Sequence, residues 1–303
     1  MPSPASAVGW FLAPATDDAP RYHAVGATIL RITVGLMWLY NVAWKRPPDF
    51  GEDSGSGLYG FTELAVEHPV FPPYSWVVEH IVLPFIQPFG WGVLVVETAL
   101  AVLLLTGTYV RLAALLGIAQ SLAIGLSVAY APEEWPWAYW LMIAAHIALL
   151  VSSSGRVLAV DAVRARLSDG RVLATVWAGA ALLTGVLVVI GSFADPLAAR
   201  GYAFGSSDPS VSLGRYNVLG GVILLVLAVL LLLAARTTSG ALGTVAVVLG
   251  VLAGLSLHAQ LGFTDPLLGG NATAAAMYFS LALVAAYVSV LPSRGREAEK
   301  VSA

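Results

Sequence analysis

The sequence contains no cysteine and few charged residues. Without thiols, the chain itself can hold no disulfide, thiolate metal site or iron–sulfur cluster, so a redox role would need a bound cofactor, a quinone-like substrate or a partner subunit. Charged residues make up 11% of the chain, against about 25% in soluble domains, and 58% of the residues are hydrophobic. The net charge of -3 gives no reason to expect nucleic acid as a partner. The composition therefore indicates a protein that is surrounded mainly by the lipid bilayer.

Long apolar runs account for most of the sequence. They have the roughly 17–22 residues that a bilayer core of about 30 Å requires. The runs cover residues 24–44, 90–108, 111–130, 136–152, 172–192, 217–235, 241–260 and 271–291. Because they are continuously apolar rather than alternating, we expect helices and not the strands of a barrel. The predicted fold is an all-α, polytopic membrane protein with about eight transmembrane helices.

Arginine and lysine are distributed unevenly between the two sides of these spans. If the amino terminus is cytoplasmic, ten of them lie in cytoplasmic segments, four lie on the outer side, and Arg31 lies inside a span. This excess of positive charge predicts that both termini are cytoplasmic. The arginine-rich linker 153–171 separates two sets of four spans, which we expect to form two four-helix bundles. The predicted organisation is a tail (1–23), a four-helix domain (24–166) with an outer loop (45–89), a second four-helix domain (172–291) and a tail (292–303).

The outer loop is apolar and aromatic in its second half, but prolines interrupt it. Proline removes a backbone donor and kinks or ends a helix, so we do not expect one spanning helix here. We predict short helices that lie at the interface or re-enter between the spans, with Tyr74, Trp76 and Trp91 at headgroup level. Two interpretations remain open. The loop roofs a lipid-accessible pocket, or it passively covers the end of the bundle.

Two ionisable residues lie well inside the predicted spans, Arg31 in the first and Glu97 in the second. A charge in this position costs at least a few kcal/mol, so it normally faces protein and has a partner. A helical rise of about 1.5 Å per residue places the two at depths that differ by roughly 10 Å. Asn41 and Lys45 lie above Glu97, at the outer end of the first span. The partner of Glu97 is therefore either Arg31 below it or one of these two residues above it.

Two further polar residues lie near the middle of the membrane, Gln120 in the third span and His146 in the fourth. Each would be an unsatisfied polar group if it faced lipid. We therefore expect at least three of Arg31, Glu97, Gln120 and His146 to line one cavity. The alternative is that an Arg31–Glu97 pair only fixes helix packing. We expect no metal site, because the spacing of His68 and His80 with the acids beside them in the outer loop matches no specific ligand pattern. We expect no bis-histidine haem, because the other histidine within a span, His258, lies at a depth that differs by roughly 10 Å.

Three motifs resemble, in their order and intervals, those of the DoxX family of membrane proteins. The matching residues are Arg31, Gly35 and Lys45 in the first span, Glu97, the leucines 103–105, Gly107 and Arg111 in and after the second, and Gly155, Arg156 and Asp161 after the fourth. The likeness covers about residues 24–166. The second half of the chain matches no DoxX feature.

The DoxX family includes DoxD, the membrane subunit of thiosulfate:quinone oxidoreductase. The resemblance implies a four-helix bundle in the cytoplasmic (inner) membrane of a bacterium and a link to quinone as substrate. In this hypothesis quinone enters from lipid beneath the outer loop, and Arg31, Glu97 and His146 exchange protons with it or bind its carbonyls. The missing electron carrier then belongs to a soluble or membrane partner subunit. The residues expected to bind the substrate are Asn41, Trp44, Lys45, Trp76 and Gln120.

Two other functions fit the same sequence. A buried Arg–Glu pair suits a proton-coupled transporter, or a protein that binds a small molecule or lipid, in which the two halves would rock. A non-catalytic scaffold or assembly factor would need the polar residues only for packing, and it would tolerate Arg31→Leu and Glu97→Leu together. The sequence also leaves open whether the chain forms a homo-oligomer.

Overall fold

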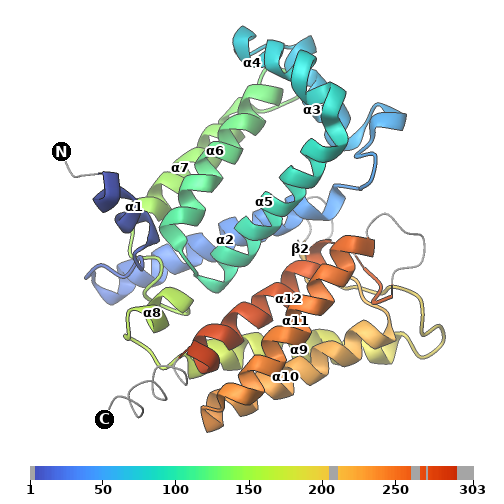
Figure 1. Ribbon diagram of the computed structural model, residues 1–303. Coiled ribbons are helices and arrows are strands. Elements are labelled where there is room, and N and C mark those ends of the chain that lie inside the picture. Colours follow the sequence, from blue (N-terminus) through green and yellow to red (C-terminus); the bar gives the residue numbers. More distant parts are fainter. Residues whose placement is uncertain (1–3, 205–210, 261–266, 271, 292–303) are drawn as a thin grey trace.

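The computed structural model describes residues 4–204, 211–260, 267–270 and 272–291, and these are mostly helical (Figure 1). The helices of the first half are α1 (Pro4–Leu12), α2 (Arg21–Trp44), α3 (Gly57–Glu67), α4 (Pro72–Val77), α5 (Ile86–Thr106), α6 (Val110–Val128), α7 (Pro136–Val151) and α8 (Val160–Arg164). The second half contains α9 (Arg171–Gly191), α10 (Val218–Thr237), α11 (Gly240–Gln260) and α12 (Ala272–Ala285). Shorter helical turns are η1 (Glu52–Ser54), η2 (Val78–Val82), η3 (Leu83–Phe85) and η4 (Ala286–Val290), and β1 (Ala203–Phe204) pairs antiparallel with β2 (Val211–Ser212).

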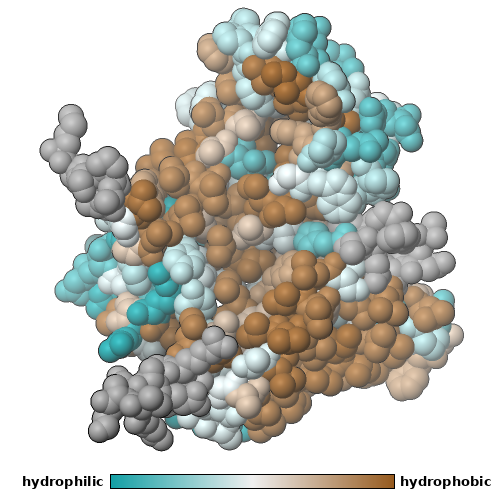
Figure 2. Space-filling view, in the orientation of Figure 1, coloured by the Kyte–Doolittle hydropathy of each residue, from teal (hydrophilic) through white to brown (hydrophobic). Residues whose placement is uncertain are grey.

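Among the described residues, seven helices are long and apolar enough to cross a membrane. Five of them are α2, α6, α9, α10 and α11. The other two are the helical run 72–106, whose last part is α5, and the helix formed by α12 together with η4. The predicted span 136–152 corresponds to α7, an apolar helix of 16 residues that is shorter than the others. Figure 2 shows a broad hydrophobic surface, with hydrophilic residues gathered at the end that carries α3 and α4 and at the end that carries α8. The prediction of an all-α, multi-pass membrane protein is confirmed.

The outer loop forms short helices, and its second half continues into α5 as one helical run of 35 residues. The prolines lie at positions where helical structure tolerates them. Pro72 and Pro73 start α4, where a missing N–H costs little, and Pro84 lies in the short 3-10 turn η3. The backbone leaves helical geometry at Phe85, with φ of -121°, and α5 begins at the next residue. The run is therefore segmented and does not form one regular helix.

The buried apolar residues form two main cores that meet at α12. The core of the first half lies between α2, α5, α6 and α7 and includes Trp38 and Leu100. The core of the second half lies between α9, α10, α11 and α12 and includes Leu224 and Tyr278. Ala276 of α12 belongs to the first core, because α12 packs against α5 and α2 as well as against α11. The two sets of helices thus share a buried interface.

For orientation we define two ends of the first half. The loop side carries residues 45–85 and the turn 129–135, and the linker side carries residues 153–170. Because α2, α5, α6 and α7 alternate in direction, each of them runs from one side to the other (Figure 1). Under the predicted orientation the loop side is the outer side and the linker side is cytoplasmic.

Candidate functional site

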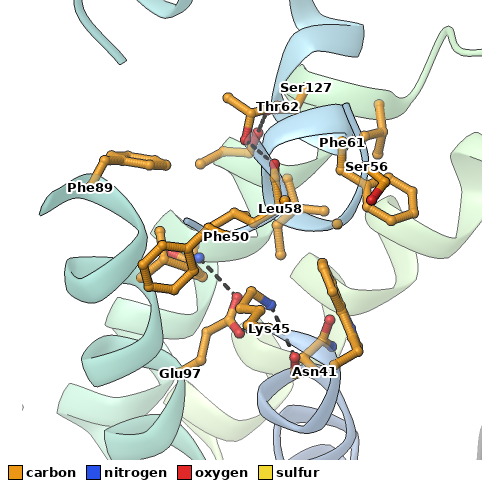
Figure 3. Close-up of a pocket in the computed structure, with 18 of the residues that line it drawn as sticks. Asn41, Lys45, Phe50, Ser56, Leu58, Phe61, Thr62, Phe89, Glu97 and Ser127 are labelled. Carbon is orange, nitrogen blue, oxygen red and sulfur yellow. Dashed lines mark hydrogen bonds and ion pairs between the residues drawn. The ribbon is translucent and has the colours of Figure 1, made fainter. Parts of the chain in front are cut away.

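A cavity of about 910 Å³ lies between α2, α5, α6 and α7, beneath α3 (Figure 3). Its volume falls within the range of about 300–1,000 Å³ that is common for small-molecule sites. Its polar lining includes Asn41, Lys45, Thr62, Tyr74, Glu97, Gln120, Ser127, Glu134 and Tyr139. Its apolar lining includes Trp44, Phe50, Phe61, Phe89, Val93, Ile124 and Met142. The cavity therefore combines aromatic walls with a few polar groups.

Helical spacing places these residues on one face of each helix. Phe89, Val93 and Glu97 follow one another at intervals of four on α5, and Gln120 and Ser127 are seven apart on α6. Residues at these intervals share a helix face. On α5 that face is apolar near the loop side and carries its one acid a little more than two turns further in. The sequence thus gives the cavity an apolar upper part and a polar floor.

The floor of the cavity is an ion pair between Lys45 and Glu97 (Figure 3). Nζ of Lys45 lies 2.5 Å from Oε2 of Glu97, and the two side chains are 2% and 1% exposed. Gln120 donates from Nε2 to Oε1 of Glu97 at 3.2 Å, and Lys45 also donates to the backbone carbonyl of Asn41 at 3.1 Å. The Lys45 ammonium lies 4.1 Å from the centre of the Trp44 ring. These contacts stabilise two charges that would be costly to bury alone.

Lys45 stands one residue beyond the end of α2, and its protonation is set by two opposing effects. Burial lowers the pKa of the ammonium, and the facing carboxylate of Glu97 offsets part of this lowering. Because the positive and negative charges balance, the floor as a whole is neutral. A ligand that reaches it therefore meets hydrogen-bonding groups without an excess charge.

The outer loop covers part of the cavity from above. Leu58, Phe61 and Thr62 of α3 line it, and the Phe61 ring lies 5.4 Å from the Trp44 ring at the end of α2. Tyr74 reaches across to α6, where its hydroxyl donates to the backbone carbonyl of Ala123 at 3.1 Å. Of the two interpretations of this loop, the structure agrees with a roof over a pocket.

A second polar cluster lies in the cavity wall nearer the loop side. The hydroxyl of Tyr74 is 2.9 Å from Oγ of Ser127, and the hydroxyl of Tyr139 donates to the carboxylate of Glu134. The sequence predicts Tyr74 at headgroup level and does not select Ser127, Glu134 or Tyr139. The signal that could have found Tyr139 is its position one turn before Met142, on the same face of α7.

Arg31 does not reach Glu97. Its side chain is fully buried near the linker side and donates to backbone carbonyls at the end of α5 and in the loop after α7. The acceptors are Leu104, Leu105, Ser154, Val157 and Leu158. The flat, five-donor guanidinium suits such a set of carbonyls. Of the partners that the depth estimate left open for Glu97, Arg31 is therefore excluded, and Lys45 forms the pair.

His146 lies beneath the cavity and not in its lining. Its Nε2 is 2.9 Å from the indole nitrogen of Trp38, and its Nδ1 is 2.7 Å from the backbone carbonyl of Met142. Because an indole N–H can only donate, Nε2 accepts and the proton resides on Nδ1, so the ring is neutral. Of the four residues expected to share a cavity, Glu97 and Gln120 do so, while Arg31 and His146 do not. The expectation of three or more is wrong.

The residues predicted to bind a substrate are divided between two places. Asn41, Trp44, Lys45 and Gln120 line the cavity. Trp76 does not, because its side chain is 56% exposed and stacks on His80 with the ring centres 4.9 Å apart. The binding roles of the lining residues, and the catalytic roles assigned to Arg31, Glu97 and His146, stay predictions.

Asp161 has a structural role that the sequence only hinted at through the motif 154–161. Its carboxylate is fully buried and accepts hydrogen bonds from the backbone N–H groups of Ala15, Tyr109 and Val110, at 3.1–3.2 Å. Arg164 pairs with it at 2.6 Å. The carboxylate therefore caps the start of α6 and ties it to the segment before α2, which fits the favourable placement of an acid at a helix N-terminus.

Among the described residues, no group of three or more histidine, aspartate or glutamate side chains could hold a metal ion. No protein-family profile, curated protein or solved structure matches this chain. The resemblance to the DoxX family therefore stays a prediction that rests on the motifs themselves.

Proposed function

We propose that this protein binds a small amphiphilic molecule of the membrane in the cavity above Lys45 and Glu97, and that a quinone is the class it binds. The proposal is carried by the hydrogen-bonding capacity of the floor. Lys45 has three N–H donors, of which one serves Glu97 and one serves the carbonyl of Asn41. Gln120 uses one of its two amide N–H donors for Glu97. One donor on each side chain is left for an acceptor inside the cavity.

A quinone suits this combination of donors and aromatic walls. Its carbonyl oxygens accept hydrogen bonds, and its flat ring can pack on aromatic side chains such as Trp44, Phe50 and Phe89, which line the cavity. A site of this kind is typical of small-molecule pockets, in which apolar walls surround a few convergent polar groups. The DoxX-like motifs support the same ligand class and a bacterial cytoplasmic membrane as its location.

The oxidoreductase part of the proposal needs a second component. The chain has no cysteine, so it cannot carry an iron–sulfur cluster or a redox-active disulfide of its own. We therefore assign electron transfer to a soluble or membrane partner subunit and assign quinone binding to this chain. In this scheme Lys45 orients the quinone by donating to a carbonyl, and Glu97 keeps the ammonium charged and in place.

Two neighbouring substitutions on α6 test whether the cavity holds a lipophilic ligand. Ala123 lines the cavity, whereas Leu122 is 43% exposed on the outer face of the helix. Ala123→Trp would fill the cavity, and Leu122→Trp is the matched control. Lipophilic molecules extracted from each purified protein are identified by mass spectrometry. We expect quinone with the wild type and with Leu122→Trp but not with Ala123→Trp. Equal amounts in all three samples, or none in the wild type after addition of a short-chain quinone, would contradict the proposal.

A proton-coupled transporter has one observation in its favour, namely a buried ion pair that faces a cavity. The shared core argues against the rocking of two halves. Ala276 of α12 is packed in the core of the first half together with Trp38 and Leu39, so independent movement would have to open this packing. The structure therefore favours a fixed binding site.

A further inference from the structure

The lining of the cavity ends part of the way along each of the four helices that enclose it. The lining residues furthest from the loop side are Tyr40 on α2, Glu97 on α5, Gln120 on α6 and Met142 on α7. Beyond these positions no described residue lines the cavity. The empty volume therefore stops at the level of the ion pair and does not continue towards the linker side.

A packed layer closes the bundle directly below. We call it the seal, and it consists of Trp38 of α2, Leu100 of α5, Gly117 of α6 and His146 of α7. The side chains of Trp38, Leu100 and His146 are between 0% and 1% exposed. The helices approach closely here, since a Cβ atom on Gly117 would lie 2.1 Å from Cδ2 of His146. The indole N–H of Trp38 donates to Nε2 of His146, and Nδ1 of the same ring is 2.7 Å from the carbonyl of Met142, so the polar side-chain atoms of the seal have partners within the protein.

A second packed region, around Arg31, closes the bundle between the seal and the linker side. Arg31 fills the space between the end of α5 and the loop after α7, and its side-chain hydrogen bonds go to backbone carbonyls. Asp161 and Arg164 pair beside it at the start of α6. The buried Lys45–Glu97 pair and the buried Arg31 thus lie in two separate layers, with the seal between them.

The opposite end of the cavity is open. Arg46, Ser54 and Ser56 belong to the lining and are exposed, and Glu134 lies in the exposed turn between α6 and α7. Other charged and titratable groups share the cavity with Glu97, namely Tyr40, Lys45 and Arg46 from the region of α2, Asp49, Tyr74 above the floor, and Glu134 and Tyr139 from α7 and its preceding turn. A continuous space therefore joins the exposed loops to the buried pair.

From these observations we infer that the cavity is a vestibule with one open end. Water, protons and polar ligands reach Lys45 and Glu97 from the loop side only, and the seal prevents access from the linker side. A ligand that takes up or releases a proton at this site therefore exchanges it with the aqueous phase on the loop side. This inference concerns access and holds for any ligand of the site, so it goes beyond the proposed function.

The absence of cysteine makes the inference directly testable by single-cysteine labelling. Gln120→Cys places a thiol at the floor, and Ser121→Cys, at the next residue of α6, places one at a position that is 0% exposed and outside the lining. Asp53→Cys and Ser168→Cys, both at exposed positions, mark the loop side and the linker side. Each variant is reconstituted in sealed vesicles and treated from one side with a membrane-impermeant, positively charged methanethiosulfonate. Remaining thiols are then counted by a maleimide gel shift after denaturation.

We expect Gln120→Cys to react completely from the side on which Asp53→Cys reacts and not at all from the side on which Ser168→Cys reacts. Ser121→Cys should react from neither side. Reaction of Gln120→Cys from the Ser168 side, from both sides or from neither would overturn the inference. If Gln120→Cys does not fold, Ser127→Cys replaces it, because Ser127 lines the cavity two turns nearer the loop side. Failure of this test would leave ligand binding untouched, so the two proposals are decided separately.

Discussion

Nζ of Lys45 and Oε2 of Glu97 lie 2.5 Å apart, with both side chains almost completely withdrawn from solvent. The pair joins the end of α2 to the middle of α5, and it forms the floor of the cavity. Its burial has a consequence for stability. A charge pair in this setting can be replaced as a unit at little cost, but removal of one partner leaves the other charge buried and uncompensated.

We therefore predict strong coupling between Lys45 and Glu97. Lys45→Met and Glu97→Leu should each lower the free energy of unfolding by about 3–5 kcal/mol, whereas the double variant should lose clearly less than the sum. Urea unfolding in detergent, monitored by circular dichroism, measures the four free energies of the cycle. Additive losses would show that the two side chains do not act as a pair.

Arg31 should matter for stability and not for ligand binding. Arg31→Met leaves the carbonyls at the end of α5 and in the loop after α7 without a donor, and we expect a loss of about 3 kcal/mol or more. Arg236→Met, on the exposed end of α10, is the control and should be close to neutral. Both variants are compared by thermal unfolding and by quinone affinity. A variant Arg31→Met that folds normally but binds quinone weakly would place Arg31 in the site after all.

Trp38 and His146 should also behave as a coupled pair. Replacing His146 by Phe removes the acceptor for a buried indole N–H, which typically costs about 1–3 kcal/mol. When Trp38→Phe is added to His146→Phe, the free energy of unfolding should fall by little more, because the unpaired indole N–H has been removed. Gly117→Ala should destabilise the same layer by overpacking, by about 1–3 kcal/mol. Unfolding midpoints of the four variants provide the comparison. Independent effects of His146→Phe and Trp38→Phe would argue against the hydrogen bond.

The carboxylate of Asp161 should be required for the first half to fold correctly. Asp161→Asn keeps the shape but loses the charge that pairs with Arg164 and caps α6, so we expect a loss of about 2 kcal/mol or more. Asp169→Asn provides the matched control, since Asp169 is 65% exposed in its ion pair with Arg171. Limited proteolysis of the loop 153–170 measures the effect locally. Equal protease sensitivity of the two variants would contradict it.

The fold could largely be read from the sequence because membrane spans are set by length and hydropathy alone. Each predicted span has a helix in the structure, although α7 is shorter than the rest. The short helices of the outer loop also followed from its prolines. The packing of α12 against α2 and α5 could not be read in this way, because alanine-rich and glycine-rich faces look alike in a span that is apolar all round.

The site was predicted in part. Depth counting placed Lys45 above Glu97 as a possible partner and Gln120 near the middle of the membrane, and these residues do line one cavity. The same counting could not separate His146 from them, because depth says nothing about which direction a side chain faces or which acceptor it finds. Trp38 carried no signal as the partner of His146, since tryptophan is ordinary in an apolar span. Arg31 was wrongly expected to line the cavity, because its hydrogen-bond partners are backbone carbonyls. Every residue has such a carbonyl, so the sequence does not show which of them a buried arginine will bind.

Quinone affinity measured on the intact protein tests the central claim most directly. Wild type, the double variant Lys45→Met/Glu97→Leu and the control Leu122→Trp are titrated with a short-chain ubiquinone and a short-chain menaquinone analogue by isothermal calorimetry in lipid nanodiscs. We predict saturable binding of at least one quinone to the wild type and the control, with affinity about tenfold or more lower in the double variant, the loss expected for a hydrogen bond from a charged donor. Equal affinity of the double variant and the wild type, or no saturable binding to the wild type, would contradict the account.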